Sequence, residues 1–178
     1  MKQTKTTDNL KEIFDVVDEN DRVIGQATRK ECNSNPKLIH RAVYVLVFNS
    51  AGELFLQKRS KTKDICPGMW SVSVSGHVDQ GESYKKAAIR EMTEEIGNIS
   101  DVQFLDKYII RGKNESEHSA IYRAISDGPF QLDPVEIEKG AFFDLKIIKK
   151  KQWEKLTPSS RLILENLERR GLLFSPAF

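Results

Sequence analysis

Acidic side chains are concentrated in one short stretch of this sequence, residues 76–97. The glycines and charged residues of interest there are Gly76, Glu82, Arg90, Glu91, Glu94, Glu95 and Gly97. If the stretch after residue 83 is a helix, with about 100° between successive residues, Glu91, Glu94 and Glu95 fall within one arc of roughly 100°. Carboxylates are the oxygen ligands that a hard divalent cation such as Mg²⁺ prefers. The spacing therefore predicts a cation site on this helix.

The alternative interpretation of these glutamates is an acidic helix face in contact with solvent. Glu91 and Glu95 are like charges four residues apart, which destabilises an isolated helix by about 0.2–0.5 kcal/mol. A cation between them removes that repulsion. Ile89, Met92 and Ile96 occupy the adjoining arc, and we expect them to face the core.

Strands outnumber helices in the elements that must position these side chains. Strands are expected at residues 13–17, 22–25, 42–48, 53–59, 70–75, 102–111, 118–125 and 141–148, and helices at 83–96 and 157–171. The strands at 42–48 and 53–59, separated by a polar turn with a glycine, form the clearest predicted hairpin. Residues 60–69 and 112–117 are expected to be loops. The pattern predicts an α+β domain with a mixed sheet flanked by helices.

Length and charge exclude several classes of protein. The chain has 178 residues, with 28 Lys and Arg against 26 Asp and Glu, a net charge of +2, so no basic excess points to nucleic acid. No apolar stretch approaches the ~20 residues of a membrane helix, and the first residues lack the apolar region of a signal peptide. Cys32 and Cys66 form no disulfide or metal motif. We expect one cytoplasmic domain over residues 1–178, with residues 1–10 flexible.

The order and spacing of the residues in 76–97 resemble the signature of the Nudix hydrolases. Five residues separate Gly76 from Glu82, and seven separate Glu82 from the Arg90–Glu91 pair. The match departs at Asn98, where the family usually has an aliphatic residue. The resemblance covers roughly residues 12–150. It implies the Nudix fold, an α/β/α sandwich with a central mixed β-sheet, in which the signature forms a loop–helix–loop motif.

The resemblance also implies roles for these residues. It implies a cation, Mg²⁺ or Mn²⁺, held by Glu91, Glu94 and Glu95, with support from Glu82 and the Gly76 carbonyl. Arg90 would orient the glutamates. The implied reaction is metal-dependent hydrolysis of a small-molecule diphosphate by attack of water on phosphorus, and a homodimer is possible. The carboxylate that takes the proton from water is a glutamate of the signature or one outside it, such as Glu117.

A closer resemblance lies outside the signature. Residues 17–20, 38–42, 56–60 and 67–70 look like the subgroup related to type I isopentenyl-diphosphate isomerase. His40 and His77 match metal-binding histidines of that isomerase, and Glu115 and Glu117 resemble its acidic pair. Ser75, however, stands where the isomerase has its catalytic cysteine, and the isomerase's first metal-binding histidine has no clear match near Cys32 and Asn33. We therefore expect a hydrolase, with an isomerase-like enzyme or a non-catalytic Nudix-like ligand-binding module as alternatives.

The remaining candidate residues each have a plain structural alternative. Arg59 is expected to bind phosphate, and its alternative is a surface charge. His77 and Lys63 are expected near the substrate, although a histidine that only stabilises its loop and a solvated loop lysine are the common cases. Glu117 lies in a polar stretch, so its alternative is a solvated turn carboxylate. Nothing in the sequence selects the group attached to the diphosphate.

Overall fold

The computed structural model describes residues 6–97 and 101–173. Its strands are β1 (Ile13–Val17), β2 (Val23–Thr28), β3 (Ile39–Phe48), β4 (Leu54–Arg59), β5 (Trp70–Val72), β6 (Val74–His77), β7 (Gln103–Arg111), β8 (Ser116–Ile125) and β9 (Ile137–Phe143). Its helices are α1 (Arg29–Cys32), α2 (Tyr84–Ile96), α3 (Leu145–Ile147) and α4 (Pro158–Arg169), with two further helical turns, η1 (Ile148–Gln152) and η2 (Trp153–Lys155). None of the helices in these ranges is long and apolar enough to cross a membrane.

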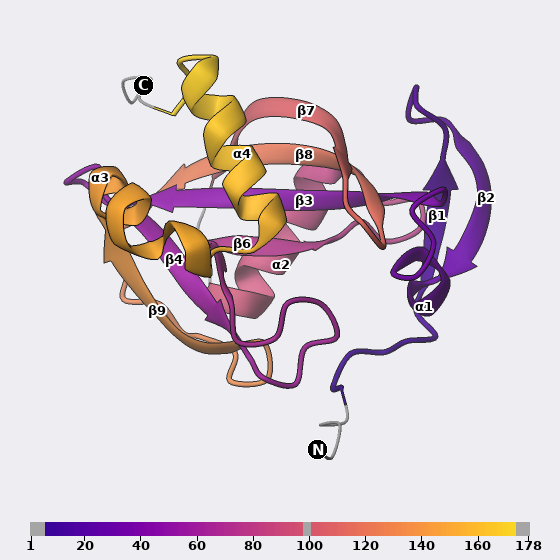
Figure 1. Cartoon of the computed structure of the whole chain (residues 1–178), viewed down its shortest axis with the longest axis horizontal. Coiled ribbons are helices and arrows are strands. Elements are labelled where there is room, and N and C mark those ends of the chain that lie inside the picture. The colour runs from indigo at the N-terminus through magenta and orange to yellow at the C-terminus, as the bar shows by residue number, and fades with distance from the viewer. Residues whose placement is uncertain (1–5, 98–100, 174–178) are drawn as a thin grey trace.

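The central strand β3 separates two apolar cores. Alternate residues of a strand point to opposite faces. Val43, Val45 and Val47 pack in one cluster with the apolar face of α2, whereas Tyr44 and Leu46 pack in the other with α4. Figure 1 shows α4 on the near side of the sheet and α2 behind it. The predicted α+β sandwich with helices on both faces of a mixed sheet is confirmed.

The strand pairing differs from the predicted hairpin of residues 42–48 and 53–59. β3 and β4 are consecutive and antiparallel, but they pair only where Phe48 meets Leu54. β3 instead runs parallel to β8 along its whole length and antiparallel to β6 over residues 42–45. β4 pairs with β5 and β9. The two strands diverge because each has other partners, which local sequence does not reveal.

The predicted single strand at 70–75 is also wrong, because the chain changes partner at Ser73. β5 pairs with β4, and β6 pairs with β3. At the break, the Ser73 hydroxyl accepts a hydrogen bond from the Val47 N–H (2.8 Å) and donates one to the Phe55 carbonyl (2.6 Å). These bonds join the two parts of the sheet. They also place β6, which carries Ser75, Gly76 and His77, beside the central strand.

Helix α2 forms where the sequence predicts it. The Ser83 side chain caps its first turn, and Gly97 ends it with φ +88°, a conformation that favours glycine. Met92 and Ile96 are fully buried against the sheet. The glutamates occupy the adjoining arc, where Glu95 is itself buried. The departure at Asn98 lies outside the described residues.

Two other predictions need correction. The predicted strand at 141–148 ends early, since β9 spans Ile137–Phe143 and Asp144 then caps the helical turn α3. β8 begins at Ser116, so Glu117 lies in a strand and not in the polar connection. Within the segment 1–10, expected to be flexible, the Asp8 side chain is 3% exposed and bound to neighbouring groups. Residues 1–5 lie outside the described part of the chain.

Gly140 in β9 offers a test of this packing. A Cβ there would lie 2.1 Å from Cζ of the Phe55 ring, which is itself packed edge-on against Phe130 and Phe142. We expect Gly140→Ala to lower the free energy of unfolding in urea by about 1–3 kcal/mol. Gly25→Ala is the matched control, since nothing lies within 4 Å of a Cβ at that strand position. Equal stability of the two variants would contradict the packing described here.

Candidate functional site

A cavity of about 630 Å³ collects the candidate residues. It is bounded by β6, α2, the loop at 60–69, the turn between β7 and β8, and the first turn of α4. The predicted site residues that line it are Arg59, Lys63, Gly76, His77, Arg90, Glu91, Glu94, Glu95 and Glu117. Glu82 lies behind this surface, joined to it through Arg90.

The guanidinium group of Arg90 connects three glutamates of the signature, Glu82, Glu91 and Glu94. It donates to both carboxylate oxygens of Glu82, at 2.9 and 3.2 Å. It also donates to Glu91 at 2.8 Å and to the His77 carbonyl at 2.9 Å, with a longer contact of 3.4 Å to Glu94. The planar, multiply donating arginine head suits this arrangement. Arg90 therefore fixes the loop before α2 against the helix.

Two of the glutamates are largely removed from solvent with like charges beside them: Glu95 is buried, and the Glu91 side chain is 15% exposed. Burial raises the pKa of Glu91, the neighbouring Arg90 lowers it and the charge of Glu94 raises it, and the net result is a pKa of about 7. Burial and the neighbouring Glu91 raise the pKa of Glu95 well above its ordinary value. Glu95 accepts a hydrogen bond from Gln57 at 2.8 Å. The Glu94 side chain is 58% exposed, so water reaches it freely.

Gly76 makes room for the Glu91 carboxylate. A Cβ at position 76 would lie 2.0 Å from Cδ of Glu91, closer than any real contact. The carboxylate therefore rests directly against the backbone of β6. The chemical groups of this centre are carboxylate and carbonyl oxygens, the donor set that Mg²⁺ and Mn²⁺ prefer. The residues present thus fit a hard divalent cation.

A second group of polar side chains lies in β3, β6 and β8. One possible ligand atom from each of His40, His77 and Glu117 lies within 4.8 Å of the others. Burial lowers the pKa of His40 to about 4 and that of His77 well below its ordinary value, so both imidazoles are neutral at pH 7. Neither ring nitrogen of the buried His40 makes a hydrogen bond of standard geometry. Two neutral imidazoles and a carboxylate form a typical ligand set for a transition metal.

Glu117 is not a solvated turn carboxylate, which was the structural alternative for this residue. It is buried in β8 and accepts a hydrogen bond from the Tyr44 hydroxyl at 2.6 Å. Burial raises the pKa of Glu117. Burial also raises the pKa of the neighbouring Glu115, to about 8, and the charge of Glu117 contributes to that shift. The polar residues on either side made Glu117 look like part of a loop. The apolar run that follows it was the available signal for a strand.

The two predicted cationic residues differ in their surroundings. The Arg59 Nε donates to the Ile65 carbonyl at 3.0 Å, and its charge lowers the pKa of Glu95 and Glu117, as expected for a guanidinium inside the cavity. The Lys63 side chain is only 7% exposed and forms ion pairs with Asp8 and Glu136. Lys63 is therefore neither a solvated loop residue nor a free phosphate-binding cation.

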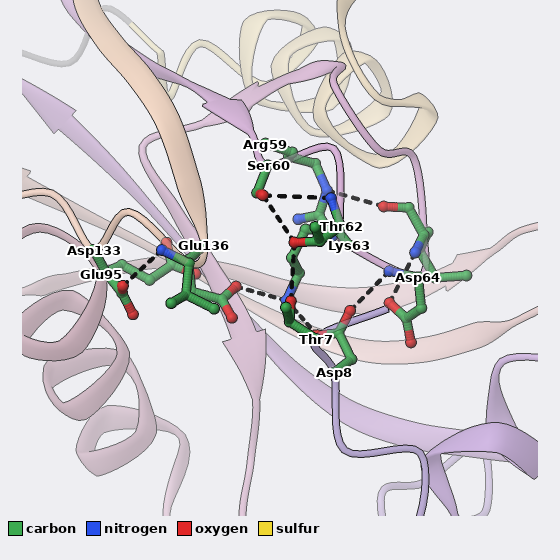
Figure 2. A network of polar contacts seen from close by, with 12 residues as sticks. Thr7, Asp8, Arg59, Ser60, Thr62, Lys63, Asp64, Glu95, Asp133 and Glu136 are labelled. Atoms are coloured by element: carbon green, nitrogen blue, oxygen red, sulfur yellow. Dashed lines mark hydrogen bonds and ion pairs between the residues drawn. The ribbon is translucent and has the colours of Figure 1, made fainter. Parts of the chain in front are cut away.

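The polar residues around Lys63 were not predicted from the sequence. Asp8 accepts hydrogen bonds from Lys63 and, at 2.7 Å, from the Asp64 N–H (Figure 2). It also forms an ion pair with Arg29. Glu136 lies between this group and Glu95 (Figure 2). Neither acid stands in a motif, and both reach the cavity through contacts with segments distant in sequence. No local signal could have found them.

The comparisons with known proteins agree with this geometry. A family model described as "NUDIX domain" matches residues 38–165. The uncharacterized Nudix hydrolase PA4841 of Pseudomonas aeruginosa is 36% identical over 133 residues, which are 74% of this chain and 78% of that protein. The uncharacterized Nudix hydrolase YfcD of Escherichia coli K12 is 35% identical over 130 residues, 72% of this chain and 71% of that protein.

Solved structures share the fold. DR0079 from Deinococcus radiodurans superposes with a TM-score of 0.72 at 24% identity, over 87% of this chain and 98% of that one. A MutT protein from Methanosarcina mazei superposes with a TM-score of 0.67 at 22% identity, over 77% and 96%. At these identities the similarity extends to the fold alone.

The raised pKa of Glu91 predicts a dependence of stability on pH. A folded-state pKa of about 7, above the ordinary glutamate value of 4.5, means that the folded protein binds this proton more tightly than the unfolded chain. The resulting stability is complete below pH 4.5 and is lost as the pH rises through 7. In EDTA, we expect the free energy of unfolding to fall between pH 5 and 8, and Glu91→Gln to remove part of that slope.

Glu138→Gln is the control for this measurement. Hydrogen bonding to Lys58 lowers the pKa of Glu138, so its own titration lies below this pH range and the slope should not change. A Glu91→Gln curve parallel to that of the wild-type protein between pH 5 and 8 would contradict the raised pKa.

Proposed function

The chain belongs to the NUDIX domain family and is a Nudix hydrolase, and we propose that it cleaves a small-molecule diphosphate with the help of a divalent cation at Glu91, Glu94 and Glu95. The observation that carries the proposal is the convergence of these glutamates on one cavity, with two of them buried as neighbouring carboxylates. Burying like charges is unfavourable unless a positive group compensates. Arg90 bonds Glu91 and lies 3.4 Å from Glu94, whereas Glu95 accepts from the neutral Gln57 amide, so a cation would compensate its charge.

The donor set favours Mg²⁺ or Mn²⁺ as that cation. Glu91, Glu94 and Glu95 would hold it, with the Gly76 carbonyl as a further ligand and Glu82 as support through Arg90. When bound, such an ion offsets the charge of diphosphate oxygens and lowers the pKa of a coordinated water. Arg90 keeps the carboxylates oriented because it bonds Glu82 and Glu91 together.

The chain's own side chains supply the remaining needs of hydrolysis. The Arg59 guanidinium lies in the cavity, where its donors suit the oxygens of a phosphate group. Water must lose a proton as it attacks phosphorus, and a nearby carboxylate takes it. Glu94 is accessible to water, whereas Glu117 is buried and bonded to Tyr44, so we assign the proton to Glu94 in preference to Glu117.

The group of His40, His77 and Glu117 supports a finer relationship, to the isopentenyl-diphosphate isomerase subgroup. We propose that these residues form a second cation centre in the same cavity, with softer ligands than the first. Ser75 lines the cavity at the position of the isomerase cysteine. Because a serine hydroxyl has a far higher pKa than a thiol, it is a poor proton-transfer group. Hydrolysis remains the favoured reaction.

Substitution of the signature glutamates tests the proposed hydrolysis. We expect Glu94→Gln or Glu95→Gln to reduce turnover by about 100-fold or more, because each removes a charge at the cation site and little volume. The measurement is phosphate release from a panel of diphosphate compounds, through a coupling phosphatase, with Mg²⁺, Mn²⁺ or EDTA. Glu138→Gln, an exposed carboxylate paired with Lys58, is the control. Full turnover in a folded Glu95→Gln protein would refute the assignment.

Ser75→Ala separates the hydrolase from the isomerase-like alternative. No step of the proposed hydrolysis uses this hydroxyl, so turnover of the diphosphate should stay within about twofold of the wild-type rate. This change is much smaller than the rate loss expected when a catalytic proton donor is removed. A large loss of rate in a correctly folded Ser75→Ala protein would mean that position 75 takes part in the reaction.

A further inference from the structure

One lysine joins the cavity to a segment that lies outside the family-matched residues 38–165. The Lys63 ammonium forms an ion pair with Asp8, from the chain's first segment, and another with Glu136 at 2.6 Å. The Asp8 side chain is 3% exposed, and the Asp64 N–H and Arg29 also bind it. Asp8 thus holds Lys63 from one side and leaves its other side to Glu136 (Figure 2).

Backbone hydrogen bonds fix Glu136 beside the end of helix α2. Its carbonyl accepts from the Ser60 N–H at 2.8 Å, and its N–H donates to the Asp133 carbonyl at 3.2 Å. Asp133 in turn donates its N–H to the Glu95 carbonyl at 2.9 Å. Glu136 is therefore tied, through one intervening residue, to the helix that carries the signature glutamates.

The Glu136 carboxylate belongs electrostatically to the same cavity as Glu91 and Glu95. It lines that cavity with them, and its charge is among those that raise the pKa of both. The Glu136 side chain is 29% exposed and has an ionic partner in Lys63. The neighbouring Glu138 carboxylate also pairs with a lysine, Lys58 at 2.8 Å, but it does not line the cavity. Lys63–Glu136 and Lys58–Glu138 are thus both lysine–glutamate ion pairs, but only the Lys63–Glu136 pair lines the cavity.

A purely structural role for Lys63 would need only Asp8. Pairing with Glu136 as well keeps a further carboxylate close to Glu91 and Glu95, where repulsion alone would drive it into solvent. Such an arrangement is favourable when a divalent cation gathers the carboxylates together.

We propose that Glu136 supplies an additional carboxylate to the cation centre of Glu91 and Glu95, and that Lys63, held by Asp8, is the positioning residue for Glu136. The inference rests on the proposed function, because it requires a cation at that centre. It adds to the site one residue outside the signature and ties cation binding to the chain's first segment.

Binding of Mn²⁺ alone, followed by the electron paramagnetic resonance of the free ion, tests the proposal without turnover. We expect Glu136→Gln to weaken Mn²⁺ binding by about 10-fold or more, the size of effect seen for groups that support a metal site. Glu138→Gln is the matched control and should bind Mn²⁺ as the wild-type protein does. Glu95→Gln should lose binding.

The outcomes separate this inference from the proposed function. If Glu95→Gln loses Mn²⁺ and Glu136→Gln binds it as the wild type does, Glu136 is not part of the centre, and the proposed function stands. If the wild-type protein binds no Mn²⁺, the proposed function fails and this inference fails with it.

A double-mutant cycle tests the positioning role of Lys63. Lys63→Gln removes a positive charge, which by electrostatics alone should tighten Mn²⁺ binding. We expect weaker binding instead, with little further effect when Glu136→Gln is also present, and recovery in Lys63→Arg. Tighter binding in Lys63→Gln, or equal losses in the presence and absence of Glu136→Gln, would overturn the positioning role.

Discussion

The burial of two adjacent carboxylates, Glu91 and Glu95, is the constraint around which the site is organised. Removing a charge from water is unfavourable by several kcal/mol per ion unless other groups compensate. Arg90 compensates for Glu91, and Gln57 donates to Glu95. Gly76 is part of the same solution, since only a residue without a side chain lets β6 lie against the Glu91 carboxylate. Each of these contacts is local to the cation centre that we propose.

The sheet places two chemically different polar centres side by side, and His77 and Glu117 of one line the same cavity as the glutamates of the other. Strand β3 pairs with β6 on one side and β8 on the other, which places His77 and Glu117 near His40. Helix α2 packs against β6 and brings the Glu91 carboxylate against Gly76, the residue before His77. One centre has only oxygen atoms and the other has two neutral imidazoles, so different metal ions suit them.

Local signals predicted the elements that depend on local contacts. Helix α2 has a serine cap, an apolar stripe and a terminal glycine within its own sequence, and it was predicted with its bounds nearly correct. The fold class and the convergence of the signature residues also followed from the sequence. The break at Ser73, the burial of Glu117 and the pairing of Lys63 were not predictable, because the groups that decide them lie in distant segments. Asp8 and Glu136 belong to no motif and emerge only from tertiary contacts.

The most direct test of the account is the position of a bound ion. Crystals soaked in Mn²⁺ would be measured at the manganese absorption edge, where the anomalous signal locates the metal without reference to activity. We expect a peak among the oxygen atoms of Glu91, Glu94 and Glu95, next to the Gly76 carbonyl. A signal confined to His40, His77 and Glu117, with none at the signature glutamates, would contradict the proposed cation site.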